Sequence, residues 1–157
     1  MLRHAVIAVI GFSAAAFATA AVIKLDRARD PSPPLAQTVI LPRSDDGHYW
    51  VTGEVGDRRI RFLVDTGATT VSLTPDDARV LGIDPDRLVY RYEVSTADGH
   101  ARAAKVRLTR LSVGGATLTD VDALVIEKGL PTSLLGMSYL GRLSRFEAGP
   151  EGLVLKN

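Results

Sequence analysis

The sequence contains no cysteine. This absence excludes disulfide bonds, thiol catalysis and thiolate metal sites, but it does not identify the cellular compartment, because a well-packed domain needs no disulfide. The chain also has little excess charge of either sign. Its formal net charge is +1, so electrostatics give no reason to expect a nucleic acid as a partner. His48 and His100 are isolated from each other and predict no metal site.

The rest of the composition is that of an ordinary globular protein. Of the 157 residues, 46% are hydrophobic and 24% are charged, which excludes disorder of the whole chain. This length accommodates one folded domain with an appendage. We find no long internal repeat and no sign of a second domain in the sequence.

An apolar segment near the N-terminus, Ala5 to Ile23, contains no charged residue. Two interpretations of residues 1–23 remain open. A transmembrane anchor needs about 20 apolar residues, which this run just reaches. A cleaved signal peptide needs a small-x-small cleavage site, which Ala18-Thr19-Ala20 would supply. Both interpretations export the rest of the chain.

Residues 24–47 are expected to form a linker. Pro31-Ser32-Pro33-Pro34 favours an extended polyproline conformation and excludes a helix. A short edge strand is expected at Thr38 to Leu41, and the turn-forming sequence Ser44-Asp45-Asp46-Gly47 follows it. The folded domain is therefore expected to begin near His48.

Residues 48–157 predict a single, mostly β domain. Short runs rich in β-branched and aromatic residues alternate with turn signals such as Gly56-Asp57. A short helix is predicted to begin at Thr74-Pro75-Asp76-Asp77 and to end at Gly82, and a second to begin near Gly136. The expected strands cover residues 49–55, 58–64, 69–73, 88–96, 101–109 and 117–126, with a last hairpin over 145–156.

Asp65 is the candidate catalytic residue. It follows Phe62-Leu63-Val64, the apolar end of an expected strand, where burial raises the cost of a carboxylate's charge. Gly67 then permits a tight turn or the close approach of another group. Asp and Gly are also common in ordinary turns, so the tripeptide by itself leaves a structural interpretation of Asp65 open.

Two motifs in the chain resemble those of a known family. Asp65-Thr66-Gly67-Ala68, preceded by Phe62-Leu63-Val64 and followed by Val71-Ser72-Leu73, resembles the active-site motif of the retropepsin-like aspartic proteases. Leu134-Leu135-Gly136 resembles the later apolar-apolar-Gly element of that family, and a hairpin with Thr96, Ala97, Asp98 and Gly99 lies between the two. The resemblance covers about residues 48–157. The chain looks most similar to the bacterial, membrane-tethered, single-domain members.

The resemblance implies an all-β fold, a closed retropepsin-like (acid protease) barrel with one or two short helices, preceded by an N-terminal apolar helix. It also implies an aspartic endopeptidase that needs neither a cofactor nor a metal. Asp65 would be catalytic, with Thr66, Gly67 and Ala68 in the active-site turn. Leu134, Leu135 and Gly136 would support that turn, and the flap over the substrate would contain Thr96, Ala97, Asp98 and Gly99.

The expected partners follow from the same resemblance. Only one Asp-Thr-Gly is present, so two chains would form a homodimer in which each contributes one Asp65 to the site that binds a peptide or protein substrate. Residues 5–23 would hold the chain in the inner (cytoplasmic) membrane with the domain in the periplasm. Secretion after cleavage near Ala20 is the alternative. No nucleic acid is expected as a partner.

Two other functions fit the same residues. A retropepsin-like domain without protease activity would act as a peptide-binding or dimerisation module tethered to the membrane. A membrane-tethered scaffold would use Asp65 only as a structural residue. The protease is the favoured hypothesis. The protease and the binding module would share the same fold, so the sequence alone does not exclude the binding module.

Overall fold

The computed structural model describes residues 38–96 and 99–157. The chain divides into two units, residues 1–32 and 33–157, and the second contains all the described residues. The predicted anchor or signal peptide, the predicted apolar helix and most of the linker lie outside the described residues, as do Ala97 and Asp98 of the expected flap. Across the described ranges, no helix has the length and apolar character needed to span a membrane.

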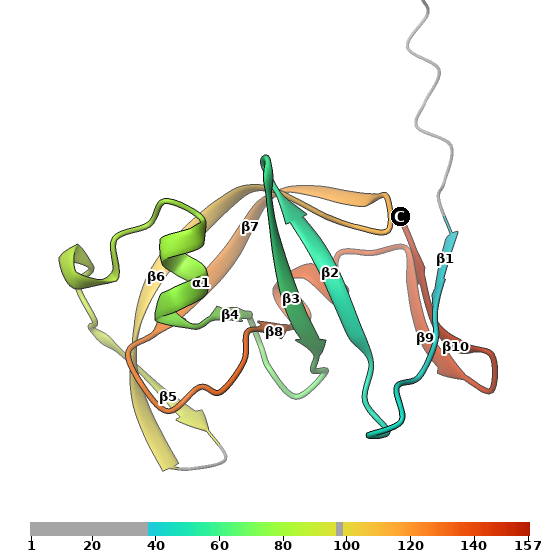
Figure 1. The fold of residues 1–157 in the computed structure, drawn as a ribbon, viewed down its shortest axis with the longest axis horizontal. Coiled ribbons are helices and arrows are strands. Elements are labelled where there is room, and N and C mark those ends of the chain that lie inside the picture. Colours follow the sequence, from blue (N-terminus) through green and yellow to red (C-terminus); the bar gives the residue numbers. More distant parts are fainter. Residues whose placement is uncertain (1–37, 97–98) are drawn as a thin grey trace, which may run out of the picture. The chain divides into compact units, whose positions relative to one another are not determined.

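The described residues are mostly β-strand, as predicted, with short helices (Figure 1). The helices are α1 (Pro75–Val80), the 3-10 helix η1 (Pro85–Arg87) and α2 (Met137–Leu140). The strands are β1 (Thr38–Leu41), β2 (Trp50–Val55), β3 (Arg58–Val64), β4 (Val71–Leu73), β5 (Tyr92–Thr96), β6 (Gly99–Val113), β7 (Ala116–Ile126), β8 (Leu134–Leu135), β9 (Arg145–Gly149) and β10 (Gly152–Lys156).

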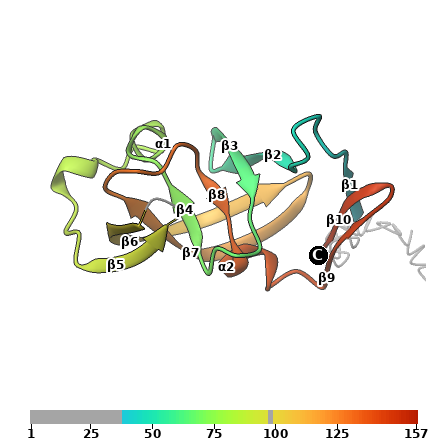
Figure 2. The ribbon, with the colours of Figure 1, turned by 90° about the horizontal axis from the view of Figure 1, so that it is seen from below.

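The larger sheet has the strand order β2-β3-β8-β4-β7-β6-β5, and β2 also pairs with the end of β6. Two of its neighbouring pairs are parallel, β3 with β8 and β4 with β7. The very short strands β4 and β8 lie side by side between β3 and β7 (Figure 2). Segments far apart in the sequence therefore meet where β3 ends, directly before Asp65.

A smaller sheet has the order β1-β10-β9. Its first strand, β1, is the edge strand expected at Thr38 to Leu41, and these residues pair with β10 along their whole length. Regular structure therefore begins before His48. The inward-facing side chains of this sheet, including Leu153 and Leu155, belong to the same hydrophobic core as those of the larger sheet.

The core is built from the alternate, inward-facing residues of the strands. Ile60 and Phe62 on β3 are almost completely buried, whereas Arg59, before Ile60, and Arg61, between the two, are exposed. This alternation is the period-2 pattern of a half-buried strand. Leu135 of β8 and Tyr139 of α2 are fully buried in the same core. Their packing fixes the position of the Leu134-Leu135-Gly136 motif.

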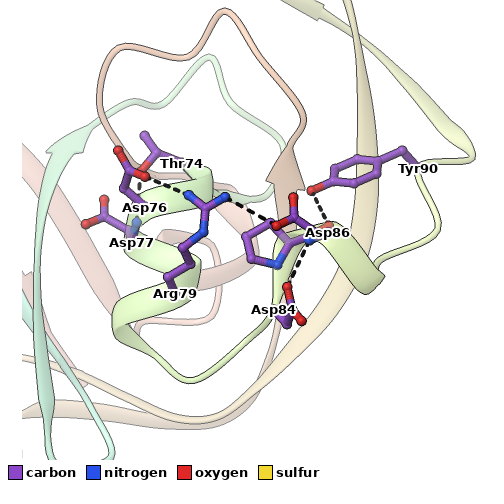
Figure 3. Close-up of polar contacts among 8 residues, drawn as sticks. Thr74, Asp76, Asp77, Arg79, Asp84, Asp86 and Tyr90 are labelled. Carbon is purple, nitrogen blue, oxygen red and sulfur yellow. Dashed lines mark hydrogen bonds and ion pairs between the residues drawn. The ribbon is translucent and has the colours of Figure 1, made fainter.

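Helix α1 begins as the sequence predicts. The Thr74 hydroxyl accepts a hydrogen bond from the backbone N–H of Asp77 at 3.1 Å, and Pro75 occupies the first turn. Arg79 forms ion pairs with Asp76 at 2.8 Å and with Asp86 at 3.8 Å (Figure 3). The pair with Asp86 links α1 to η1, whereas the pair with Asp76 lies within α1. Both pairs are exposed and contribute little to stability individually.

Candidate active site

Asp65 is the first residue after β3 and is held from three directions. Its backbone N–H donates to the Leu135 carbonyl at 3.1 Å, and its carbonyl accepts from the Ala68 N–H at 3.3 Å. The carboxylate oxygen Oδ1 accepts from the Gly67 N–H at 2.8 Å. This last bond is the local Asp side-chain turn that such sequences favour, and it fixes the orientation of the carboxylate.

Gly136 packs directly against the loop that contains Asp65, here called the active-site loop (residues 65–70). A Cβ atom added there would lie 2.2 Å from the Thr70 carbonyl oxygen and 2.7 Å from that of Ala68. The next residue, Met137, donates its N–H to the Ala68 oxygen at 2.8 Å. The requirement for glycine in Leu134-Leu135-Gly136 is therefore one of space: the two chain segments approach too closely for any side chain.

Two serine side chains on either side of this element hold the two ends of β4. Ser138 Oγ accepts from the Val71 N–H at 2.9 Å and donates to the Asp122 carbonyl at 2.7 Å. Ser133 Oγ, which is completely buried, accepts from the Thr74 N–H at 3.1 Å and donates to the Asp77 carboxylate at 2.5 Å. Neither serine was predicted from the sequence.

A cavity of about 740 Å³ opens beside Asp65. Its floor is a row of side chains that share one face of the larger sheet: Leu63 pairs with Leu134, Leu134 with Ser72, and Ser72 with Leu124. Residues 67–70 and 129–132 form further parts of the lining, and β5 contributes Glu93 to Thr96. The lining is largely apolar, and its two carboxylate residues are Asp65 and Glu93.

The comparisons with known proteins agree with this geometry. Residues 51–142 match the family model described as gag-polyprotein putative aspartyl protease. The crystal structure of a retropepsin-like aspartic protease from Rickettsia conorii has 34% sequence identity and a TM-score of 0.67, and the alignment covers 77% of this chain and 98% of that one. The chain belongs to the retropepsin-like aspartic protease family.

Two curated relatives of this retropepsin-like chain are described only as uncharacterized proteins. One, from the cobV 5′ region of Sinorhizobium sp, is 40% identical over 122 residues, covering 77% of this chain and 52% of the relative. The other, from Rickettsia prowazekii (strain Madrid E), is 37% identical over 117 residues, covering 74% and 50%. The chain thus spans about half the length of the curated relatives it matches.

The structure brings Asp65 and four other predicted site residues of this retropepsin-like domain together at one cavity. Gly67, Ala68, Thr96 and Leu134 line the same cavity as Asp65. Three others have different positions: Thr66 is exposed beside the cavity, Leu135 is buried in the core, and Gly136 lies under the loop. Of the expected flap, Thr96 donates to the Gly99 carbonyl at 3.0 Å, and Ala97 and Asp98 are outside the described residues.

The described part of the retropepsin-like domain offers little for a metal ion. Among residues 38–96 and 99–157, no group of three or more His, Cys, Asp or Glu side chains is arranged to hold one. The Asp65 carboxylate accepts a hydrogen bond from the Gly67 N–H.

Proposed function

We propose that the chain is an aspartic endopeptidase that hydrolyses peptide bonds with a water molecule activated between two Asp65 carboxylates. The observation that carries this proposal is that Asp65 lines a largely apolar cavity, with its carboxylate oriented by the Gly67 N–H. The family membership of the chain supports the same reaction. Each chain supplies one Asp65, so the active form is a homodimer with a two-fold axis between the two carboxylates.

The chemistry follows from two carboxylates at close range. They do not both ionise at low cost, so the pair shares one proton. The ionised carboxylate removes a proton from the bound water as it attacks the scissile carbonyl, and the protonated one donates a hydrogen bond to that carbonyl. The pair titrates as a unit rather than as two independent groups.

The surrounding residues position the reaction. Thr66 is exposed next to Asp65 and is proposed to form a hydrogen bond across the dimer axis that stiffens both loops. Strand β5 is at one edge of the larger sheet and contributes to the cavity lining, so its unpaired backbone groups are available to an extended peptide. Together with residues 96–99 it forms the flap that covers the substrate and excludes water.

We also propose that residues 5–23 place the domain at the inner (cytoplasmic) membrane, with the domain in the periplasm. The support is the uncharged apolar run itself; secretion after cleavage near Ala20 is the alternative. A tether raises the concentration of partner chains in the membrane plane. The anchored chain should therefore be more active per molecule than a chain lacking residues 1–23 at matched dilution, and equal activity would argue against a tether.

The direct experiment is cleavage of a denatured protein substrate from acidic to neutral pH by the intact chain and by Asp65→Asn. Asp57→Asn is the matched control, because Asp57 lies in the exposed turn between β2 and β3. We expect cleavage by the wild type and the control only. Cleavage that survives Asp65→Asn would exclude the proposed chemistry. Dimers that bind peptide without cleaving it would identify the catalytically silent binding module instead.

A further inference from the structure

The floor of the cavity continues beyond its edge onto β2. Leu63, the first residue of the floor, is paired on its other side with Trp50. Directly paired residues of neighbouring strands project from the same face of a sheet. Trp50 is therefore the next residue of the row that contains Leu63, Leu134 and Ser72, and its ring extends the apolar floor outward from the cavity.

The Trp50 ring is held in one orientation by two contacts. Its indole N–H donates to the Asp46 carboxylate at 2.8 Å, and this hydrogen bond is the main cause that lowers the pKa of Asp46. On the ring itself, the Arg61 guanidinium lies 4.3 Å from the ring centroid. A guanidinium at this distance is attracted to the indole face, so the positive charge is fixed above the extension of the floor.

Arg61 differs from the other arginines of β3 in its partners. Arg58 is paired with Asp57 at 3.5 Å, and Arg59 with Glu54 at 3.4 Å. Within the described ranges, no carboxylate lies within ion-pair distance of Arg61, whose close contact is the Trp50 ring. Its hydrogen-bond donors thus remain available to an outside acceptor, and a planar guanidinium suits a carboxylate best.

The distance from the reacting group fits an extended peptide. Arg61 of β3 lies four residues before Asp65, which directly follows that strand, and this separation corresponds to about 13 Å along the strand direction. An extended peptide that runs alongside β3 advances by a similar length per residue. A side chain about four residues from the scissile bond of such a peptide reaches Arg61. Within the described ranges, the lining of the cavity contains no lysine, arginine or histidine. Arg61 lies two residues from Leu63 of the floor, on the same face of β3.

We propose that Trp50 and Arg61 form an outer substrate subsite that selects an acidic side chain about four residues from the scissile bond. This inference rests on the proposed function and deepens it by naming a substrate class. The Trp50 ring packs against the aliphatic part of the substrate residue, and the Arg61 guanidinium binds its carboxylate. Because Arg61 is exposed, the charge preference is modest and decreases as ionic strength rises.

The test uses a natural reporter. The chain contains one tryptophan, so intrinsic tryptophan fluorescence reports on Trp50 alone. The probes are synthetic peptides of Ala, Val and Leu, without tryptophan, that carry Glu, Gln or Lys at one scanned position. Binding is measured on the full chain with Asp65→Asn, which leaves the peptides intact. We expect the Glu peptide to change the fluorescence and to bind about fivefold more tightly than the Gln peptide.

Three variants at two positions of β3 separate the subsite from general charge effects. Arg61→Gln should remove the preference for Glu, and Arg61→Glu should reverse it in favour of Lys. Arg59→Gln, on the same face but paired with Glu54, should preserve it. A preference that survives Arg61→Gln, or that Arg59→Gln removes equally, would overturn the proposal. A loss of dimers in Arg61→Gln, measured by sedimentation equilibrium, would also overturn the proposal, because it would show that a second copy of the chain covers this surface in the wild type.

Failure of the subsite and failure of the protease proposal give different results. Cleavage by the wild type without a preference for the acidic peptide would exclude the subsite and keep the protease. Selective binding at Trp50 without any cleavage by the wild type would keep the subsite and exclude the protease. Cleavage that is about fivefold more efficient for the Glu peptide, and that depends on Arg61, would support both.

Discussion

The Ser138 hydroxyl accepts a hydrogen bond from the backbone N–H of Val71, 67 positions earlier in the sequence, at 2.9 Å. The same hydroxyl donates to the Asp122 carbonyl of β7. Val71 is the first residue of β4 and directly follows the loop that contains Asp65. A single side chain therefore links that loop to the second motif and to the sheet.

Ser138→Ala should reduce both stability and turnover. It leaves the Val71 N–H without its acceptor, which costs about 1–3 kcal/mol in the free energy of unfolding. Because the loop behind Asp65 is no longer fixed, kcat should fall while KM changes little. Urea denaturation and steady-state kinetics measure the two effects.

Two further serine variants test whether the Ser138 hydroxyl is responsible. Ser138→Thr retains a hydroxyl and should restore most of the lost turnover. Ser144→Ala removes a hydroxyl that donates to Lys156 at the smaller sheet, so kcat should not change. Equal kcat values for Ser138→Ala and Ser144→Ala would contradict the role assigned to Ser138.

Gly136→Ala should displace the active-site loop. The added methyl group would overlap the carbonyl oxygens of Thr70 and Ala68, and relief of this overlap requires backbone movement. We expect a loss of about 1–3 kcal/mol in the free energy of unfolding, with a larger proportional loss of peptide cleavage.

Gly149→Ala is the control for Gly136→Ala. The nearest atom to an added Cβ at Gly149 is 4.0 Å away, so stability should stay within about 0.5 kcal/mol of the wild type. If Gly136→Ala and Gly149→Ala unfold at the same urea concentration, the close packing of Gly136 under the loop is not important for the fold.

Tyr139 predicts how stability changes at alkaline pH. Its side chain is completely buried, and its hydroxyl donates to the Ala116 carbonyl at 2.5 Å. Burial raises the pKa of Tyr139 to about 12, from 10.0 in the absence of such effects. The folded state therefore holds this proton more tightly than the unfolded state does, and the resulting stabilisation is complete below pH 10 and lost as the pH rises toward 12.

Tyr139→Phe tests this dependence. The variant should be less stable at neutral pH by about 1–2 kcal/mol, because the Ala116 carbonyl loses its donor. The difference from the wild type should narrow as the pH rises from about 10 to about 12. Urea denaturation at a series of pH values measures both quantities. A constant difference across that range would show that the Tyr139 proton is not linked to folding.

The sequence was informative wherever a local pattern determines the structure. The turn at Asp65-Thr66-Gly67, the start of α1 at Thr74 and the β class of the domain follow from short-range chemistry: a side-chain oxygen beside free backbone N–H groups, or alternating apolar residues. Leu134-Leu135-Gly136 was found through its family resemblance. The reason for its glycine became clear only from the overlap with Thr70.

The sequence was less informative where tertiary contacts decide the structure. Ser133 and Ser138 have no local signature, because their partners are Thr74 and Val71, which are distant in sequence. The strand expected over 69–73 begins only at Val71, because Thr70 belongs to the loop packed on Gly136. The strand expected over 88–96 begins at Tyr92, after η1. The edge strand expected at Thr38 to Leu41 is present as β1, but its partner, the C-terminal strand β10, is distant in sequence and was not predicted.

The central claim is that one active site requires Asp65 from two chains. Mixing the wild type with Asp65→Asn at constant total protein tests it most directly. If both carboxylates are needed and the dimers exchange subunits, only dimers of two wild-type chains are active. An equal mixture should then retain about one quarter of the wild-type cleavage rate, because the share of such dimers is the square of the wild-type fraction. An equal mixture with Asp57→Asn should retain the full rate. Activity that falls only in proportion to the wild-type fraction, to about one half, would contradict the claim.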